Sequence, residues 1–218
     1  MINYEDMIEK HLTISDNVAI GFEKILSKVK RYGKNVKVLI NDKEYNTREL
    51  YDYTAIIMYP ENKEIPEKSR WQTESALDRY AEKFIMGDII PDGVPYTYGN
   101  LMRCPINQVE KCIEKLYRSS TDRQATIMIG DYNCLNMKEP PCCRVVDFKI
   151  RENKLNMTLL FRSHDITAWP VNLWGFAKLQ KYIADRLNVG VGLICCHSMS
   201  LHLYDGDYDL LGWQSFSI

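Results

Sequence analysis

Residues 144–162 read RVVDFKIRENKLNMTLLFR, and this stretch predicts a β-hairpin. Two apolar segments, 144–150 and 155–162, flank the polar turn 151–154, which is the usual pattern of a hairpin. In the second segment every other residue is apolar, and the residues that share this face are Leu155, Met157, Leu159 and Phe161. Because side chains alternate across a strand, Arg162 lies on the other face and points away from the main core.

The rest of the chain mixes helical and strand patterns around this hairpin. Apolar residues at helical spacing predict helices at 14–30, 74–86, 108–117 and 173–187. Short apolar runs predict strands at 36–40, 54–59, 125–129, 191–196 and 201–204. These elements do not alternate regularly as βαβ units. We therefore expect an α+β fold, in which helices pack on a mixed, twisted β-sheet within a single domain.

The segment PENKEIPEKS at 60–69 is the most loop-like part of the chain, because it is charged and contains two prolines. It separates a variable N-terminal part, residues 1–69, from residues 70–218, which carry the motifs described below. With 218 residues, 45% of them hydrophobic, the chain can bury one sizeable core. We expect one domain over residues 1–218.

The composition argues against two classes of partner. The chain has 28 Lys and Arg against 29 Asp and Glu, a formal net charge of −1, so no summed basic field attracts DNA. No apolar run approaches the ~20 residues that span a bilayer, and the N-terminus MINYEDMIEK lacks the apolar core of a signal peptide. We expect a soluble, cytoplasmic protein that binds neither DNA nor a membrane.

Seven cysteines form an odd set with two vicinal pairs, which is a poor framework for disulfides. Most of them should be reduced thiols. Zinc is the alternative, since His197 follows Cys195 and Cys196. However, no C-x-x-C motif occurs, and vicinal cysteines rarely bind one ion together, so we expect no metal site.

Three segments contain side chains that packing alone does not explain. In the first, EPPCCRVVDF at 139–148, two prolines stiffen the backbone directly before Cys142 at the start of a strand. Cys142 is a candidate nucleophile if a guanidinium group such as that of Arg162 lowers the pKa of its thiol. The alternative for any single cysteine is a buried, inert thiol.

The second segment, FRSHDITAWPVN at 161–172, places charged and amide side chains at the end of an apolar strand. Asp165 and Asn172 could each cap a helix, and Asn172 directly precedes the apolar helix predicted at 173–187. As a group, these polar residues would also suit a ligand with phosphate and heterocyclic parts.

In the third segment, HSMSLHLY at 197–204, His202 and Tyr204 lie on one face of an extended strand. In this order and at these separations, the three segments resemble the thymidylate synthases, in particular their short, archaeal-type branch. The matching motifs are Pro141-Cys142, Arg162-Ser163-His164-Asp165, Asn172 and His202-Leu203-Tyr204.

Two upstream motifs extend the resemblance to about residues 74–208. Tyr98-Gly-Asn-Leu-Met-Arg103 is similar to the family's Tyr-Gly-x-x-x-Arg stretch. Asp122-Arg-Gln-Ala125 stands where the family has Ser-Arg-Arg. Here Gln124 replaces the second arginine of the pair, and Cys143 stands where many members carry a histidine.

The interval from Asp165 to Asn172 is one residue shorter than in the familiar bacterial enzymes. Two further family features have no clear match in the chain. For the N-terminal phosphate loop of those enzymes, Arg48 is a weak substitute. For the glutamate that organises water near the pyrimidine, Glu74 is the candidate.

The resemblance implies the reductive methylation of dUMP to dTMP by methylene-tetrahydrofolate or a related methylene-tetrahydropterin, without a metal. The catalytic residues it implies are Cys142, Tyr98 and Asp165. Attack of the Cys142 thiolate on C6 of uracil makes C5 enolate-like, which divides one difficult step into easier ones. Tyr98 would help to remove the C5 proton through ordered water, and Asp165 would face the pterin.

The same resemblance implies how dUMP is held. Arg162 and Arg123 would bind the phosphate with Ser163, because a guanidinium group suits bidentate contacts. Asn172 would read uracil, accepting from N3–H and donating to O4. His202 and Tyr204 would bind the 3′-hydroxyl. Many members are homodimers that supply the arginine pair across the interface, so Arg123 acts either in its own chain or in a partner.

Two alternatives stay open at this point. One is a nucleotide hydroxymethylase of the same fold that acts on dCMP or CMP without hydride transfer. Because such enzymes commonly carry an acidic residue at the base-reading position, Asn172 favours uracil. The other is a catalytically inactive homologue that binds a nucleotide or RNA, which the departures at Cys143 and Gln124 keep under consideration.

Overall fold

The computed structural model describes residues 4–208, and an eight-stranded mixed sheet forms its centre. The strands are β1 (Leu12–Ser15), β2 (Lys34–Ile40), β3 (Lys43–Ile57), β4 (Thr126–Met128), β5 (Cys143–Arg151), β6 (Lys154–Phe161), β7 (His164–Asp165) and β8 (Gly190–Tyr204). The order across the sheet is β1-β3-β8-β6-β5-β4, with β2 paired to β3 and β7 paired to β8. β6 runs parallel to β8, whereas β3 and β5 run antiparallel to their neighbours β8 and β6. The expected α+β fold is therefore confirmed.

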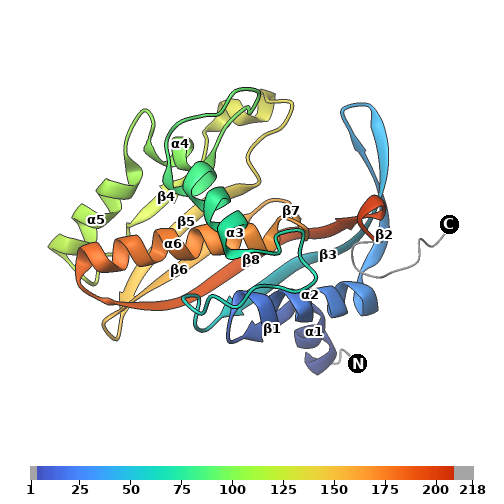
Figure 1. Ribbon diagram of the computed structural model, residues 1–218, viewed down its shortest axis with the longest axis horizontal. Helices are drawn as coiled ribbons and strands as arrows, with labels where there is room; N and C mark the ends of the chain where they lie inside the picture. Colours follow the sequence, from blue (N-terminus) through green and yellow to red (C-terminus); the bar gives the residue numbers. More distant parts are fainter. Residues whose placement is uncertain (1–3, 209–218) are drawn as a thin grey trace.

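The helices pack mainly on one face of this sheet. The α-helices are α1 (Tyr4–His11), α2 (Val18–Tyr32), α3 (Glu74–Tyr80), α4 (Tyr98–Arg103), α5 (Gln108–Arg118) and α6 (Trp169–Leu187). The chain also forms the π-helix η1 (Ala81–Met86) and two short 3-10 helices, η2 (Tyr132–Asn136) and η3 (Asp205–Asp207). Figure 1 shows α6 running along the sheet in front of β6 and β8, with α2 lying near β1 and β3. None of the helices within residues 4–208 is long and apolar enough to cross a membrane.

The hairpin predicted from residues 144–162 is confirmed. Arg151 pairs with Lys154, and the two residues between them, Glu152 and Asn153, have φ of 51° and 56°. Two consecutive positive φ angles are typical of the turn whose twist matches that of a tight hairpin. The apolar face of β6 is fully buried, so the alternation expected for this strand is correct.

Several predicted elements differ from the observed ones in their bounds. The helix predicted at 14–30 begins at Val18, because Asn17 caps it by accepting a hydrogen bond from Ile20 N at 2.9 Å. Residues 12–15 form β1 instead, which pairs in parallel with the end of β3. The two short strands predicted at 191–196 and 201–204 are one strand, β8, because the polar residues between them still pair with β3.

The other differences also arise from pairing and capping. β3 starts at Lys43, so the polar segment before residue 54 is mostly strand, paired to β2 and β8. The helix predicted at 173–187 begins earlier, at Trp169, with Pro170 in its first turn. Proline is well suited to that position because the first helical N–H groups have no partner within the helix. The loop predicted at 60–69 is confirmed, since the segment forms neither helix nor strand.

Candidate active site

A cavity of about 290 Å³ lies where β5 begins, β6 ends and α6 starts. The residues of its wall that the sequence singled out are Tyr98, Cys142, Ser163, Asp165 and Asn172. Its wall also contains the aromatic side chains of Tyr80, Phe84 and Tyr96. The volume is at the lower end of the range of small-molecule sites, roughly 300–1,000 Å³. The structure thus brings together five side chains that lie far apart in the sequence.

The Arg162 guanidinium holds the segment that carries Cys142. Its Nη2 lies 3.8 Å from the Cys142 Sγ and donates to the Pro140 carbonyl at 2.7 Å. Its Nε donates to the Pro141 carbonyl at 3.2 Å, and the Arg162 backbone N donates to the Cys142 carbonyl at 2.8 Å. The two prolines and the guanidinium together fix the position of the thiol.

The pKa of the Cys142 thiol is raised above its ordinary value, contrary to the expectation from the sequence. Burial is the largest cause, because it disfavours the charged thiolate. The positive charge of Arg162 acts in the opposite direction and lowers the pKa, but by less. In the free protein the thiol is therefore mainly protonated at neutral pH, and Arg162 is the group that makes ionisation easier.

Cys143 points away from Cys142, as the strand alternation predicts. Its side chain is fully buried, and its Sγ donates to the Val145 carbonyl at 3.7 Å. The Cys143 backbone N donates to the Tyr98 hydroxyl at 3.3 Å. Tyr98 is itself held between the rings of Phe161 and Phe176. Burial raises the pKa of Tyr98 well above its ordinary value, so this hydroxyl stays protonated.

Asn172 is buried in the first turns of α6 and does not cap the helix. The helix starts three residues earlier, and Asn172 is 5% exposed. Its Oδ1 accepts a hydrogen bond from the Tyr80 hydroxyl at 2.6 Å, and its Nδ2 lies 3.3 Å from His164 Nε2. The capping alternative for this residue is therefore wrong, and both ends of its amide have a partner.

Sequence reasoning did not identify Tyr80 or give His164 a role of its own. Tyr80 comes from α3, 92 residues before Asn172, so nothing in the local pattern links the two. His164 lies inside the Arg-Ser-x-Asp motif, which was its only signal. Its ring stacks on Phe161 with the centroids 3.7 Å apart, and its Nδ1 lies 3.2 Å from Ser198 Oγ.

Asp165 connects the cavity to β8. Its Oδ1 accepts from the Thr167 backbone N at 2.8 Å and from the Thr167 hydroxyl at 2.9 Å. The backbone of Asp165 pairs with that of His202, and the rings of His202 and Tyr204 lie edge to face, 5.1 Å apart. Burial, with Asp165 and Cys142 as further causes, raises the pKa of Tyr204. His202 and Tyr204 thus lie side by side, next to the carboxylate of the cavity.

Arg123 is not part of this cavity within its own chain. It is exposed in the loop before β4, and β4 runs antiparallel to β5 from Thr126, which faces Asp147, so the loop lies beyond Asp147 on the side away from Cys142. From Cys142 to Asp147 the chain alone spans about 16 Å at ~3.3 Å per residue. Gln124 beside it accepts a hydrogen bond from Lys115.

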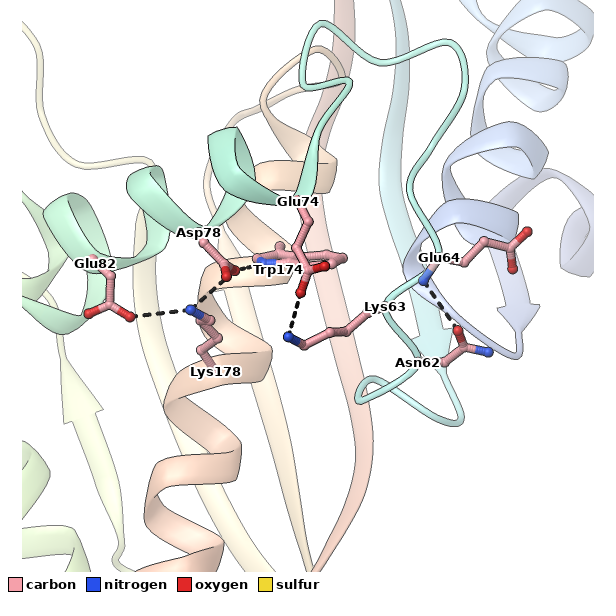
Figure 2. Close-up of polar contacts among 8 residues, drawn as sticks. All are labelled: Asn62, Lys63, Glu64, Glu74, Asp78, Glu82, Trp174 and Lys178. Atoms are coloured by element: carbon pink, nitrogen blue, oxygen red, sulfur yellow. Dashed lines mark hydrogen bonds and ion pairs between the residues drawn. The ribbon is translucent and has the colours of Figure 1, made fainter.

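The side chains of Arg48 and Glu74 have partners outside the cavity lining. Arg48 donates to the carbonyls of Val29 and Lys30, both at 2.8 Å, and so completes the C-terminal end of α2. Glu74 forms an ion pair with Lys63 at 2.6 Å, and Figure 2 shows it facing the 60–69 loop. Neither substitute suggested by the sequence lines the cavity of its own chain.

The polar contacts in Figure 2 join three elements on the outside of the molecule. Lys178 of α6 bonds to Asp78 at 3.1 Å and to Glu82 at 3.2 Å, and Trp174 Nε1 donates to Asp78 at 2.8 Å. These contacts attach α3 and η1 to α6, and so set the position from which Tyr80 reaches the cavity. Across residues 4–208, no group of three or more His, Cys, Asp or Glu side chains is placed to hold a metal ion.

Comparison with known proteins extends the resemblance found in the motifs. The family model described as thymidylate synthase matches residues 69–214. A protein of Methanosarcina acetivorans, named "Putative thymidylate synthase", is 39% identical over 181 residues, which cover 80% of this chain and 82% of that protein. A protein of Bacillus phage SP01, named deoxyuridylate hydroxymethyltransferase, is 30% identical over 145 residues, 56% of this chain and 37% of that protein.

A solved structure supports the fold independently. Thermostable thymidylate synthase A from Bacillus subtilis superposes with a TM-score of 0.66 at 17% identity, covering 92% of this chain and 86% of the other. At that identity the likeness concerns the fold alone. It confirms the mixed sheet packed by helices that the sequence predicts.

Proposed function

The chain belongs to the thymidylate synthase family, and on that premise we propose that it catalyses the reductive methylation of dUMP to dTMP. The observation that carries this proposal is the Cys142 thiol, 3.8 Å from the Arg162 guanidinium, in the same cavity as the buried Asn172 amide. A thiol with a cation beside it and a buried amide thus lie at one cavity, which supports the proposed roles of Cys142 as nucleophile and Asn172 as the residue that reads the base. The cosubstrate is a methylene-carrying reduced pterin of the tetrahydrofolate type.

Cys142 begins the chemistry in this proposal. C5 of uracil is not a carbanion at neutral pH, and addition of the thiolate to C6 gives C5 the character of an enolate. Burial keeps the thiol protonated in the free protein, and Arg162 offsets part of that effect. Arg162 and Ser163, which are adjacent in the sequence, also bind the 5′-phosphate, where a guanidinium group makes strong charge-assisted hydrogen bonds.

The remaining residues bind the sugar, help to transfer the C5 proton and face the pterin. His202 and Tyr204 bind the 3′-hydroxyl from β8, and Tyr98 helps to transfer the C5 proton through ordered water. Asp165, whose Oδ1 is fixed by Thr167, faces the pterin. The aromatic wall around Phe84 and Tyr96 fits a flat heterocycle, and the bound pterin supplies the one-carbon unit and the hydride. The seven cysteines are all free thiols, which fits the expected location in the cytoplasm.

Hydroxymethylation is the second candidate, and the phage relative is the observation that favours it. That relative is named for a reaction on deoxyuridylate, so the same base would receive a hydroxymethyl group without hydride transfer. Hydroxymethylation of dCMP or CMP requires instead that Asn172 tolerate cytosine. A catalytically inactive binder would keep the cavity and lose turnover altogether.

Ultraviolet difference spectra separate these candidates. The protein is mixed with a methylene-tetrahydropterin and with dUMP, dCMP or CMP in turn, and the nucleotide product is identified by mass spectrometry. The synthase yields dTMP and a dihydropterin. A hydroxymethylase yields a hydroxymethyl nucleotide and no dihydropterin, and an inactive homologue yields neither. Formation of hydroxymethyl product without dihydropterin would refute the proposed reaction.

A homodimer would bring Arg123 to the phosphate from a partner chain. The sheet face opposite the helices carries exposed apolar side chains, among them Ile14, Met128 and Met199, which suits a second copy. The test mixes Arg123→Ala chains with Cys142→Ala chains. If Arg123 acts across the interface, the mixed dimer regains one intact site and activity returns. If the mixture stays inactive and each variant sediments as a monomer, the proposal of a shared site is wrong.

A further inference from the structure

The Asn172 amide lies between two side chains that approach it from different elements. Tyr80, at the end of α3, donates to Oδ1 at 2.6 Å. His164, in β7, meets Nδ2 through its Nε2 at 3.3 Å. The amide of Asn172 lines the cavity between them.

The proton on His164 has one consistent position in this arrangement. The ring is fully buried against Phe161, and burial lowers the pKa of His164 to about 3, so the imidazole is neutral at pH 7. A neutral imidazole donates through one nitrogen and accepts through the other. If Nε2 accepts from Asn172, then Nδ1–H donates to Ser198 Oγ at 3.2 Å.

We propose that Tyr80 and His164 are positioning residues that fix the direction of the Asn172 amide, and that they thereby make the cavity select uracil over cytosine. This inference rests on the proposed function. An asparagine amide has two acceptor sites on its oxygen and two N–H donors. Tyr80 uses one acceptor site, and His164 uses one donor. One acceptor site and one N–H are left for the base, and these match N3–H and O4 of uracil.

Cytosine requires the opposite order, because its N3 accepts and its amino group donates. To present that order, the Asn172 amide would have to turn over. Tyr80 would then have to accept instead of donate, and the proton of His164 would have to move from Nδ1 to Nε2, with Ser198 donating to Nδ1. In the turned arrangement the Tyr80 hydroxyl loses the hydrogen bond that it donates to Oδ1. Losing a donated hydrogen bond in a buried site costs free energy, so the network resists the turn.

The test compares the dissociation constants of dUMP and dCMP, by calorimetry, for the wild type and three variants. Tyr80→Phe removes only the hydroxyl, and His164→Gln replaces the imidazole by an amide that can turn over. In each, we expect the preference for dUMP over dCMP to fall about three- to tenfold, the effect of one net hydrogen bond. Tyr182→Phe is the matched control, because Tyr182 lies farther along α6, where its hydroxyl accepts from Arg186 and donates to Glu110 of α5.

Nitrogen NMR of the ligand-free protein tests the network without any nucleotide. The chain has four histidines, and His164→Gln identifies the signal of His164. We expect a neutral ring protonated on Nδ1. A proton on Nε2, or an unchanged dUMP preference in both Tyr80→Phe and His164→Gln, would overturn the inference while leaving the proposed function intact. A wild type that prefers dCMP would overturn both this inference and the proposed function. The turnover assay described above would then show which reaction the protein catalyses.

Discussion

The two ends of the cavity are built in different ways. At the end proposed to read the base, called the reading end, Asn172 is buried and hydrogen-bonded to both Tyr80 and His164. At the nucleophile end, the Cys142 thiol has one cation beside it, at 3.8 Å, and burial raises the pKa of that thiol. The amide proposed to read the base is therefore held by two partners. The thiol proposed as nucleophile is protonated and has the Arg162 guanidinium beside it.

The largest effect expected at the nucleophile end comes from Cys142→Ala. Without the thiol there is no covalent step, so turnover should fall by at least about 1,000-fold while dUMP still binds. Cys143→Ala is the matched control, because that side chain is buried on the opposite face and should leave turnover within about tenfold. Mass spectrometry with 5-fluoro-dUMP and the pterin should place the adduct on Cys142. An adduct on another cysteine would remove Cys142 from this role.

The sequence predicts the nucleophile end better than the reading end. The hairpin at 151–154 and the opposite directions of Cys142 and Cys143 follow from local strand alternation, which needs no tertiary contact. The direction of the Cys142 pKa shift does not follow, because burial is set by residues from several elements. The charge of Arg162 was visible in the sequence, but the larger effect of burial was not.

Long-range pairing explains most of what the sequence missed. β1 and the full lengths of β3 and β8 depend on pairing with partners that lie far away in the chain. The mostly polar run 197–200 gives no local strand signal. Tyr80 reaches Asn172 only after α3 has packed on α6. Asn172 also looked like a helix cap because the helix start at Trp169 depends on a proline turn that the apolar pattern does not mark.

Asn172→Asp is the strongest change to the reading end. An ionised carboxylate offers only acceptors, so it opposes O4 of uracil and can accept from the amino group of cytosine. Each mispaired group costs about 1–3 kcal/mol, and the preference between dUMP and dCMP should move by ten- to a hundredfold toward dCMP. Competition between the two nucleotides on wild type and variant measures this change. An equal preference in both proteins would show that Asn172 does not read the base.

Acid should weaken the reading end through His164. Its pKa is about 3 in the folded protein and 6.5 when unperturbed, so below pH 6.5 the unfolded chain takes up a proton that the folded chain does not. Stability from this group is complete above pH 6.5 and falls as the pH approaches 3, by about 2 kcal/mol between pH 7 and pH 5. Burial also lowers the pKa of His202, so His202 contributes to the pH dependence in the same direction. Urea unfolding of His164→Gln, which keeps His202, is therefore the reference. Parallel pH profiles for the two proteins would contradict this account.

Arg162→Lys should have the smallest effect of these changes, because it keeps the positive charge and removes only the planar guanidinium group with its several N–H donors. Lysine has one nitrogen, whereas Arg162 uses Nε and Nη2 to hold the Pro141 and Pro140 carbonyls while Nη2 also faces Cys142. We expect the dissociation constant of dUMP to rise about tenfold, since part of a charge-assisted contact is lost. Deoxyuridine lacks the phosphate, so its weaker binding should change less than that of dUMP. Arg186→Lys, which alters an ion pair with Glu110 at the other end of α6, should leave both constants unchanged. Equal losses for dUMP and deoxyuridine in Arg162→Lys would mean that Arg162 acts only by holding the Pro140–Cys142 segment. Arg162 would then order the backbone at the nucleophile end and would have no role in binding phosphate.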